Sequence, residues 1–324
     1  MNHSNTKRSG LRSTWEAVKN YPVIFIVVGL VAIFSALYTK RFLSPVNFTA
    51  TLRQFVTLML FSIGPSIVML LGSMDLSFIG VWMLGSVLLW ILTPVIGPLS
   101  LLVFPLLGLA TGFIAGVVHT KGRIPSFILT LAILITYWGL TVVLSGGYPR
   151  PVKGYDFITA PVLPRVPTPF LWSIPIIIAS IIVVLRTRLG TYFWAIGSNE
   201  EGTRLAGIDV DRYKIIAFML SGTFTGIGSI ILFGHLGGSA PVEFNMNNVV
   251  RPLVAIILGG TPMAGGSGGP HRTILGVFTF SILYRGLYLS PLRPEIIDVV
   301  VGIVLILSVI INSRGTRMKG VDIS

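Results

Sequence analysis

The charged side chains that could do chemistry in this chain are concentrated in one stretch, residues 186–214. Five of the 24 Lys and Arg residues and four of the 11 Asp and Glu residues lie in it. The basic ones are Arg186, Arg188, Arg204, Arg212 and Lys214, and the acidic ones are Glu200, Glu201, Asp209 and Asp211. In a chain that is otherwise very apolar, such a stretch predicts ionic contact with a partner in the surrounding water.

The middle of this stretch has the features of a short helix. Ser198 or Asn199 can cap its first amides. Glu200 and Glu201 follow at the end where the helix dipole is positive. Gly207 is placed to end the helix. A helix of this length is not stable alone, so we expect it to pack on the rest of the chain or on a partner.

Residues typical of catalytic or metal sites are sparse elsewhere. The chain has no cysteine, which excludes thiolate catalysis and Cys-based metal sites. The four histidines are scattered and lack metal-ligand spacing. The glycine-rich run GGTPMAGGSGGP has no Lys-Ser/Thr ending, so it is not a nucleotide phosphate loop. We therefore expect no metal ion, no cofactor and no enzymatic activity in this chain itself.

Asp75 is the carboxylate of greatest interest, and two interpretations of it stay open. A charged group at membrane depth is costly and usually functional. Asp75 could instead cap a helix that begins near Leu76. Only Arg285 and Asp298 are comparable ionisable residues within apolar runs. A carrier driven by protons or sodium usually has more of them, so we expect the driving energy to come from elsewhere.

Composition determines what positions these residues. Hydrophobic residues make up 53% of the chain, charged residues 11%, and the mean hydropathy is +0.85, whereas roughly 25% of the residues of a soluble domain are charged. Continuous apolar runs recur, each able to cross about 30 Å of hydrocarbon as a helix. We predict an all-α polytopic membrane protein with about ten transmembrane helices. The runs are 22–39, 53–71, 78–94, 99–118, 124–145, 170–185, 215–233, 250–264, 273–289 and 296–312.

The net charge of +13 is explained by basic residues that flank the membrane spans and meet anionic lipid, so no nucleic-acid partner is expected. The distribution of Lys and Arg favours both termini in the cytoplasm, with 186–214 on the same side. We predict a cytoplasmic segment 1–21, a transmembrane domain 22–312 and a cytoplasmic tail 313–324.

Some of these helices are predicted to be broken. Gly64-Pro65 interrupts the second run, and segments 72–80 and 259–269 cannot be regular lipid-facing helices. A second glycine pattern predicts close helix packing, because residues four apart share one helix face. Its members are Gly108, Gly112 and Gly116 in one run and Gly222 and Gly226 in another.

The stretch AIGSNEEGTRLAGIDVDRYK (195–214) resembles the cytoplasmic coupling segment of binding-protein-dependent ABC importer permeases. It is most similar to the branch for ribose, xylose and galactosides. The matching positions are Ala195, Gly197, Asn199, Gly207 and Ile208. The chain departs from the pattern at Gly202 and Thr203, where alanines are typical.

Three further segments are similar to motifs of the same family, in the same order. They are GSMDLSFIG (72–80), KGRIPSFILTLAILITYWGL (121–140) and LGGTPMAGGSGG (258–269). The resemblance extends over about residues 50–312. Four motifs in one order make coincidence a poor explanation.

The resemblance implies a permease subunit of an ATP-driven monosaccharide importer in the plasma (inner) membrane of a prokaryote. It implies three partners: ABC ATPase subunits that bind ATP and Mg, a soluble extracytoplasmic solute-binding protein, and a second permease chain in a homodimer or heterodimer. The residues implied in ATPase coupling are Asn199, Glu200, Glu201, Arg204, Leu205 and Gly207. Further candidates for lining or gating the pathway are Asp75, Ser77, Phe127, Thr130, Gly259, Gly260, Gly265 and Gly266.

Two alternatives remain. Related importers for branched-chain amino acids or nucleosides share this permease architecture. A stand-alone channel or ion-driven carrier is the alternative from another class, and uptake by the chain alone without ATP would favour it. The proline-rich segment 146–169 is predicted on the outer side, where it is either a docking surface for a soluble partner or only a stiffened connection.

Overall fold

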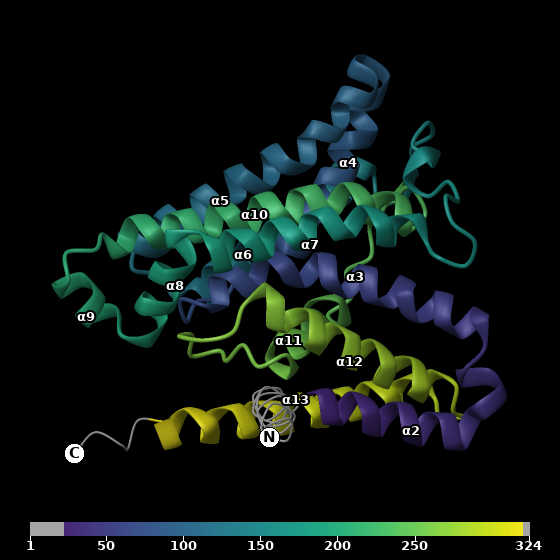
Figure 1. Cartoon of the computed structure of the whole chain (residues 1–324). Helices are drawn as coiled ribbons and strands as arrows, with labels where there is room; N and C mark the ends of the chain where they lie inside the picture. Colours follow the sequence, from purple (N-terminus) through teal and green to yellow (C-terminus); the bar gives the residue numbers. More distant parts are fainter. Residues whose placement is uncertain (1–22, 320–324) are drawn as a thin grey trace, which may run out of the picture.

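The computed structural model describes residues 23–319, and this part of the chain is almost entirely helical (Figure 1). The predicted segment 1–21 and residues 320–324 of the predicted tail lie outside it. The α-helices are α2 (Val23–Phe42), α3 (Pro45–Met69), α4 (Phe78–Ile96), α5 (Val103–Lys121), α6 (Ser126–Ser145), α7 (Thr168–Arg186), α8 (Arg188–Ser198), α9 (Glu200–Leu205), α10 (Val210–His235), α11 (Asn247–Leu258), α12 (Pro270–Tyr288) and α13 (Pro294–Lys319). Two short 3-10 helices, η1 (Gly97–Leu102) and η2 (Asp156–Ile158), complete the helical elements.

The all-α polytopic membrane fold is confirmed at this level. Each predicted apolar run overlaps one of the helices. Within the described residues, 5 continuous helical stretches are long and apolar enough to cross a membrane. They are α3, the stretch Phe78–Lys121 that joins α4 to α5, α6, α7 and α10. The number of ten crossings is not confirmed and stays a prediction.

Helix α3 corrects one sequence prediction, because it continues through Gly64 and Pro65 without a break. A proline inside a helix removes one N–H donor and normally kinks or ends the helix. Here α3 is buried against α10 and α12 along most of its length, and this packing holds the helix together. Gly64 permits the approach of α10, since a Cβ at this position would lie 2.6 Å from the Ser221 carbonyl oxygen.

The predicted close packing at the glycine repeats is confirmed between α5 and α10. A Cβ at Gly112 would overlap the Phe218 carbonyl oxygen, and one at Gly222 would overlap the Gly108 carbonyl oxygen. Gly116 lies in the same way against Ile215. The two backbones therefore touch directly, which couples any movement of α10 to α5.

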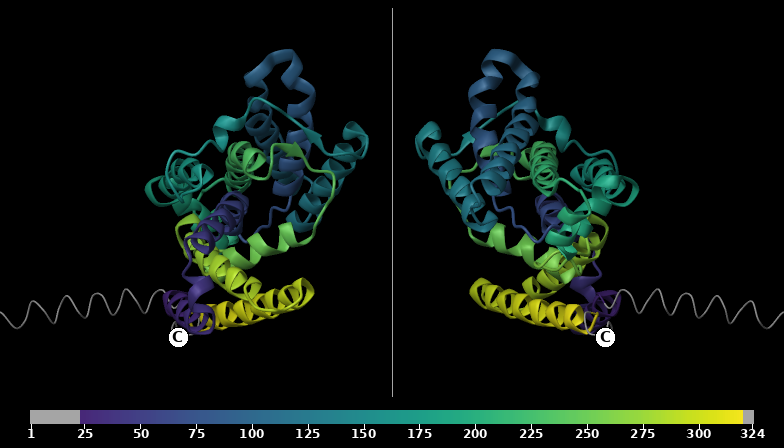
Figure 2. Two further views of the ribbon diagram at one scale, coloured as in Figure 1. Left: turned by 90° about the vertical axis from the view of Figure 1, so that its right-hand side faces the viewer. Right: turned by 90° about the vertical axis from the view of Figure 1, so that its left-hand side faces the viewer.

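The connections between the helices gather at two opposite ends of the bundle (Figure 1). One end carries α8 and α9. The other carries the 146–167 connection, whose strand β1 (Arg150–Pro151) pairs antiparallel with β2 (Ser239–Ala240). The first of these two connections was predicted to lie on the outer side. Figure 2 shows α2 and α13 together at one edge, where Phe34 packs with Ile282 and Leu283 of α12.

Candidate functional site

The charged stretch 186–214 contains two complete short helices rather than one, and α10 begins within it at Val210. The predicted short helix is present as α9, but α8 was missed. Thr187 begins α8 by accepting a hydrogen bond from the Leu189 amide at 3.2 Å. Phe193 and Ile196 face inward and are buried. The apolar spacing of Leu189, Phe193 and Ile196 is a signal that could have revealed this helix.

The predicted ends of α9 are confirmed. The Asn199 side chain accepts a hydrogen bond from the Gly202 amide at 2.8 Å, and Gly207 follows the helix in the left-handed region at φ +81°. The two departures from the family pattern fit this geometry. A Cβ at Gly202 would lie 2.9 Å from the side-chain amide nitrogen (Nδ2) of Asn199, so a glycine here leaves the capping side chain undisturbed. Thr203 is buried and donates to the Asn199 carbonyl at 2.7 Å.

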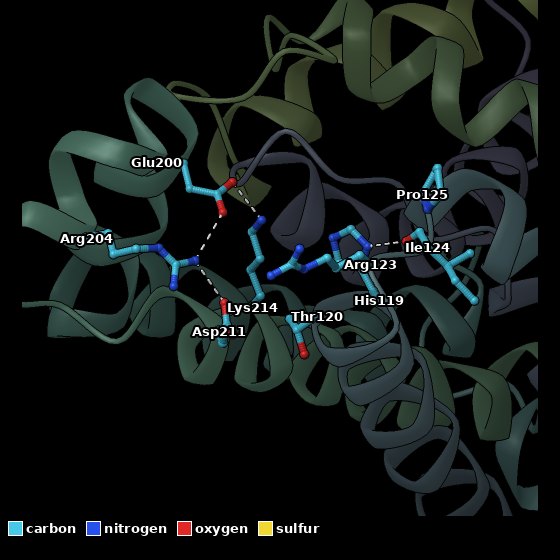
Figure 3. Close-up of a pocket in the computed structure, with 9 residues that line it drawn as sticks. All are labelled: His119, Thr120, Arg123, Ile124, Pro125, Glu200, Arg204, Asp211 and Lys214. Carbon is cyan, nitrogen blue, oxygen red and sulfur yellow. Dashed lines mark hydrogen bonds and ion pairs between the residues drawn. The ribbon is translucent and has the colours of Figure 1, made fainter.

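One face of α9 is tied to the bundle by ion pairs (Figure 3). Glu200 pairs with Lys214 of α10 at 2.7 Å. Arg204 pairs with Asp211 of α10 at 3.0 Å, and Lys121 at the end of α5 lies 3.7 Å from the same carboxylate. The hydrogen bond and charge of Asp211 raise the pKa of Arg204, so its guanidinium stays charged. The pairs of Glu200 and Arg204 link α9 to α10, and the Lys121–Asp211 pair links α10 to α5.

The other face of α9 is free. Glu201 and Leu205 lie one turn apart, the exposed fraction of Leu205 is 84%, and Glu201 makes no ion pair within the described residues. The predicted coupling residues therefore separate into two groups. Glu201 and Leu205 face outward, whereas Asn199, Glu200, Arg204 and Gly207 shape and anchor the helix.

The glycine-rich segment 259–269 packs against α8 and Leu70. The Gly266 amide donates to the Leu70 carbonyl at 2.9 Å, and Trp194 of α8 donates to the Gly268 carbonyl at 3.2 Å. A Cβ at Gly197 would overlap the Leu70 carbonyl oxygen. A Cβ at Gly265 would also lie close to the Leu70 carbonyl oxygen. Among the predicted gating glycines, Gly265 and Gly266 thus lie at the end of α8.

The remaining two gating glycines occupy a different place. Gly259 and Gly260 form the turn after α11, and a Cβ at Gly259 would lie 2.5 Å from the Arg272 carbonyl oxygen. Gly260 adopts φ +90°, a conformation that suits glycine. The role of these two glycines here is to turn the chain tightly from α11 toward α12.

Asp75 is buried, with an exposed fraction of 1%, and its carboxylate accepts three hydrogen bonds. One oxygen accepts from the Ser77 amide at 2.9 Å and from the Ser77 hydroxyl at 2.6 Å. The other oxygen accepts from the Ser221 hydroxyl of α10 at 2.6 Å. The capping interpretation is confirmed in part, because the carboxylate accepts from the Ser77 amide just before α4, whereas a functional role of Asp75 stays a prediction. Asp75 shapes the turn before α4, and it also joins that turn to α10.

The segment 70–77 also contacts the beginning of α6. The Met74 amide donates to the Ser126 hydroxyl at 3.0 Å, and the Thr130 hydroxyl lies 3.4 Å from the Met74 carbonyl. Thr130 is buried, whereas the Phe127 side chain is 48% exposed. The four motifs found separately in the sequence thus meet around residues 70–77. Sequence reasoning gave no indication of this convergence. It did not single out Ser221, and it named Lys214 only as a charged residue of 186–214 and not as the partner of Glu200.

The two other ionisable residues of the apolar runs have structural partners. Asp298 pairs with Arg251 at 2.8 Å and accepts from Asn247 at 3.0 Å, which ties α13 to α11. Arg285 donates to the Asn47 side chain at 3.1 Å and joins α12 to α3. Both groups are engaged in holding helices together.

Comparison with known proteins agrees with the four motifs. The family model described as the permease component of a branched-chain amino acid transport system matches residues 47–309. The chain is 31% identical to the ribose import permease protein of Escherichia coli K12 over 296 residues, which covers 88% of this chain and 91% of that protein.

Two further relatives are more distant in sequence. A xylose/arabinose import permease protein of Sulfolobus acidocaldarius is 26% identical, over 92% of this chain and 87% of its own length. An autoinducer 2 import system permease protein of Photorhabdus luminescens is 29% identical, over 92% of this chain and 91% of its own length. No solved structure matches the chain. Because the family model covers most of the residues, the chain belongs to this family of transport-system permease components.

Proposed function

We propose that this chain is the transmembrane permease subunit of an ATP-driven ABC importer for a monosaccharide. It forms the translocation pathway, and α9 receives the movement of ATPase subunits. The observation that carries the proposal is the division of α9 into an anchored face and a free face. A helix held by Lys214 and Asp211 that presents Glu201 and Leu205 outward is suited to transmit force from a docked partner. Relatives named for ribose and for xylose and arabinose favour a sugar as the solute.

The proposed assembly places the remaining tasks on partner chains. ABC ATPase subunits bind ATP and Mg, a soluble extracytoplasmic protein delivers the solute, and a second permease chain completes the pathway. This arrangement puts α9 and both termini in the cytoplasm of a prokaryote, with the 146–167 connection on the outer face of the inner membrane. Nucleotide binding at one end and the loaded binding protein at the other would bias a two-state switch.

The contacts around α9 offer a physical route for that switch. Movement of α9 reaches α10 through its ion pairs, and α10 touches α5 along the glycine contact. The bond between Ser221 and Asp75 carries the same movement to the turn before α4. Displacement at α9 is therefore expected to shift α4, α5 and α10 together.

Reconstitution of the purified complex in vesicles tests the proposal. Uptake of a radiolabelled pentose should require ATP, the ATPase subunits and the binding protein together. Uptake by this chain alone without ATP would contradict the proposal and favour a channel or an ion-driven carrier.

Branched-chain amino acids are a second solute class to test, because the matching family model is described as the permease component of their transport system. Competition during the same uptake assay separates the two. An excess of unlabelled ribose or xylose should reduce pentose uptake, whereas leucine and adenosine should not. Uptake of labelled leucine or adenosine by the complex would replace the sugar assignment with the amino-acid or nucleoside alternative.

A further inference from the structure

A cavity of about 480 Å³ lies between α9 and the turn that joins α5 to α6. Figure 3 shows its lining. The charged residues around it come from both sides, with Arg123 on the α5–α6 turn and Glu200, Arg204, Asp211 and Lys214 on α9 and α10. None of the four motifs predicted a cavity here.

The charges around this cavity do not balance. Glu200 pairs with Lys214, and Asp211 pairs with Arg204, so these four residues neutralise one another. Arg123 makes no ion pair with any carboxylate of residues 23–319. The cavity therefore has one positive charge in excess, and an anion that entered it would meet an uncompensated guanidinium. Attraction between unit charges in such a partly enclosed site is stronger than in open water.

The backbone at Arg123 is unusual for an arginine. Its φ of +53° lies in the left-handed region, which is costly for residues other than glycine and asparagine. Such conformations persist where the surrounding structure imposes them, often at functional sites. In this turn the Arg123 side chain extends toward the same opening as Lys214 (Figure 3).

We propose that this cavity receives an aspartate or glutamate side chain of the ATPase subunit, with Arg123 as its ion-pair partner. The proposal rests on the proposed function, because it needs an ATPase docked on Glu201 and Leu205. A guanidinium can hold a carboxylate through two parallel hydrogen bonds. The cavity shares α9 with the free docking face, so one partner could occupy both.

A second contact would have a mechanical consequence. A single short helix with one free face leaves a docked partner able to pivot about it. An ion pair at Arg123, on a different element, fixes the orientation of the partner relative to the α5–α6 turn. That turn leads directly to Ser126, which contacts the segment 70–77. The ATPase would then act from two sides on residues 70–77, where the four motifs meet.

Two substitutions at one position test the proposal in the assembled complex. Arg123→Asn removes the charge while suiting the left-handed backbone, so misfolding does not explain a loss of binding. Arg123→Lys keeps the charge and introduces an amine that a carbodiimide can join to a nearby carboxylate. Arg188→Asn and Arg188→Lys are matched controls, because Arg188 is exposed on α8 and does not line the cavity.

We expect Arg123→Asn to weaken association of the ATPase subunit by about tenfold or more, which corresponds to about 1.4 kcal/mol. In Arg123→Lys membranes, mass spectrometry should find a carbodiimide crosslink between residue 123 and an acidic residue of the ATPase. The Arg188 variants should show neither effect.

Three outcomes would overturn the inference. Unchanged association of Arg123→Asn together with no crosslink from Arg123→Lys contradicts it directly. Loss of co-purifying anionic phospholipid from Arg123→Asn, with ATPase association intact, would assign the cavity to a lipid headgroup instead. If the unsubstituted chain binds no ATPase at all, the proposed function itself fails, and the inference fails with it.

Discussion

At the scale of single residues, α9 separates neighbours that look alike in the sequence. Glu200 and Glu201 are adjacent carboxylates, and both were predicted to act in coupling. A helix turns about 100° per residue, so their side chains point to different faces. Glu200 meets Lys214 at 2.7 Å, whereas Glu201 faces outward. The distinction gives each residue a different expected phenotype.

Glu201→Arg should abolish association with the ATPase while the chain still inserts normally in the membrane. Reversal of charge on the exposed face opposes a partner surface that fits a carboxylate. Co-purification of the ATPase with the tagged permease measures this effect. Glu200→Gln serves as the control, because it changes the anchored face and should retain most of the binding. An intact complex with full transport in Glu201→Arg would remove the docking assignment.

Asp75 offers a second prediction at this scale. Asp75→Ala removes the acceptor for Ser77 and Ser221 in a buried site, so we expect a destabilisation of about 1–3 kcal/mol. Asp75→Asn keeps one acceptor oxygen and the shape of the side chain, and should lose less. Thermal denaturation of the purified protein in detergent measures both. Equal stability of Asp75→Ala and the unsubstituted protein would show that these bonds contribute little.

At the scale of elements, direct backbone contact decides how α5 and α10 pack. Two helices approach this closely only where small residues face each other. The repeats at Gly108, Gly112 and Gly222 satisfy that requirement, and each lies against backbone atoms of the other helix. The sequence predicted a close contact from the four-residue spacing. It did not state which helix would be the partner, because spacing describes one helix face at a time.

Gly112→Val is expected to destabilise the protein by at least about 1–3 kcal/mol, since the added side chain would overlap the Phe218 backbone. A lower melting temperature in detergent would reveal the effect. Gly139→Val in α6 is the matched control, because no atom outside its own helix lies within 4 Å of a Cβ placed there. Similar losses in the two variants would indicate a general cost of valine in these helices rather than a clash.

At the scale of the whole molecule, the two ends of the bundle carry different features. α8 and α9 lie at one end, and the paired connections β1 and β2 lie at the other (Figure 1). Both ends are reached by the same long helices, α5 and α10 among them. A displacement at one end can therefore reach the other through rigid elements and not through flexible loops.

The absence of cysteine from the chain allows a direct test of which end faces the cytoplasm. A single cysteine introduced by Tyr148→Cys should react with a membrane-impermeant maleimide added to intact cells, because Tyr148 is 70% exposed in the connection predicted outside. Leu205→Cys should react only after the cells are opened. Labelling of Leu205→Cys in intact cells would invert the predicted topology.

The amino-acid sequence alone determined the environment, the helical character and the family of this protein. Apolar runs must form helices in lipid because their backbone groups have no other partner there. Local signals also placed the ends of α9, since Asn199 and Gly207 act on neighbouring residues in the chain. These features depend on interactions between residues that are close in sequence, which is why they could be predicted.

Only the tertiary structure decided how these parts act together. Pro65 stays within a continuous helix because neighbouring helices hold it, which local propensity does not reveal. Ser221 donates a hydrogen bond to Asp75, and Gly197 packs against the Leu70 carbonyl, although each pair is more than a hundred residues apart in the sequence. Arg123 lines a cavity together with Glu200 and Arg204 of α9, which the sequence did not indicate. Such contacts depend on how helices pack in three dimensions, and one sequence contains no local signal for them.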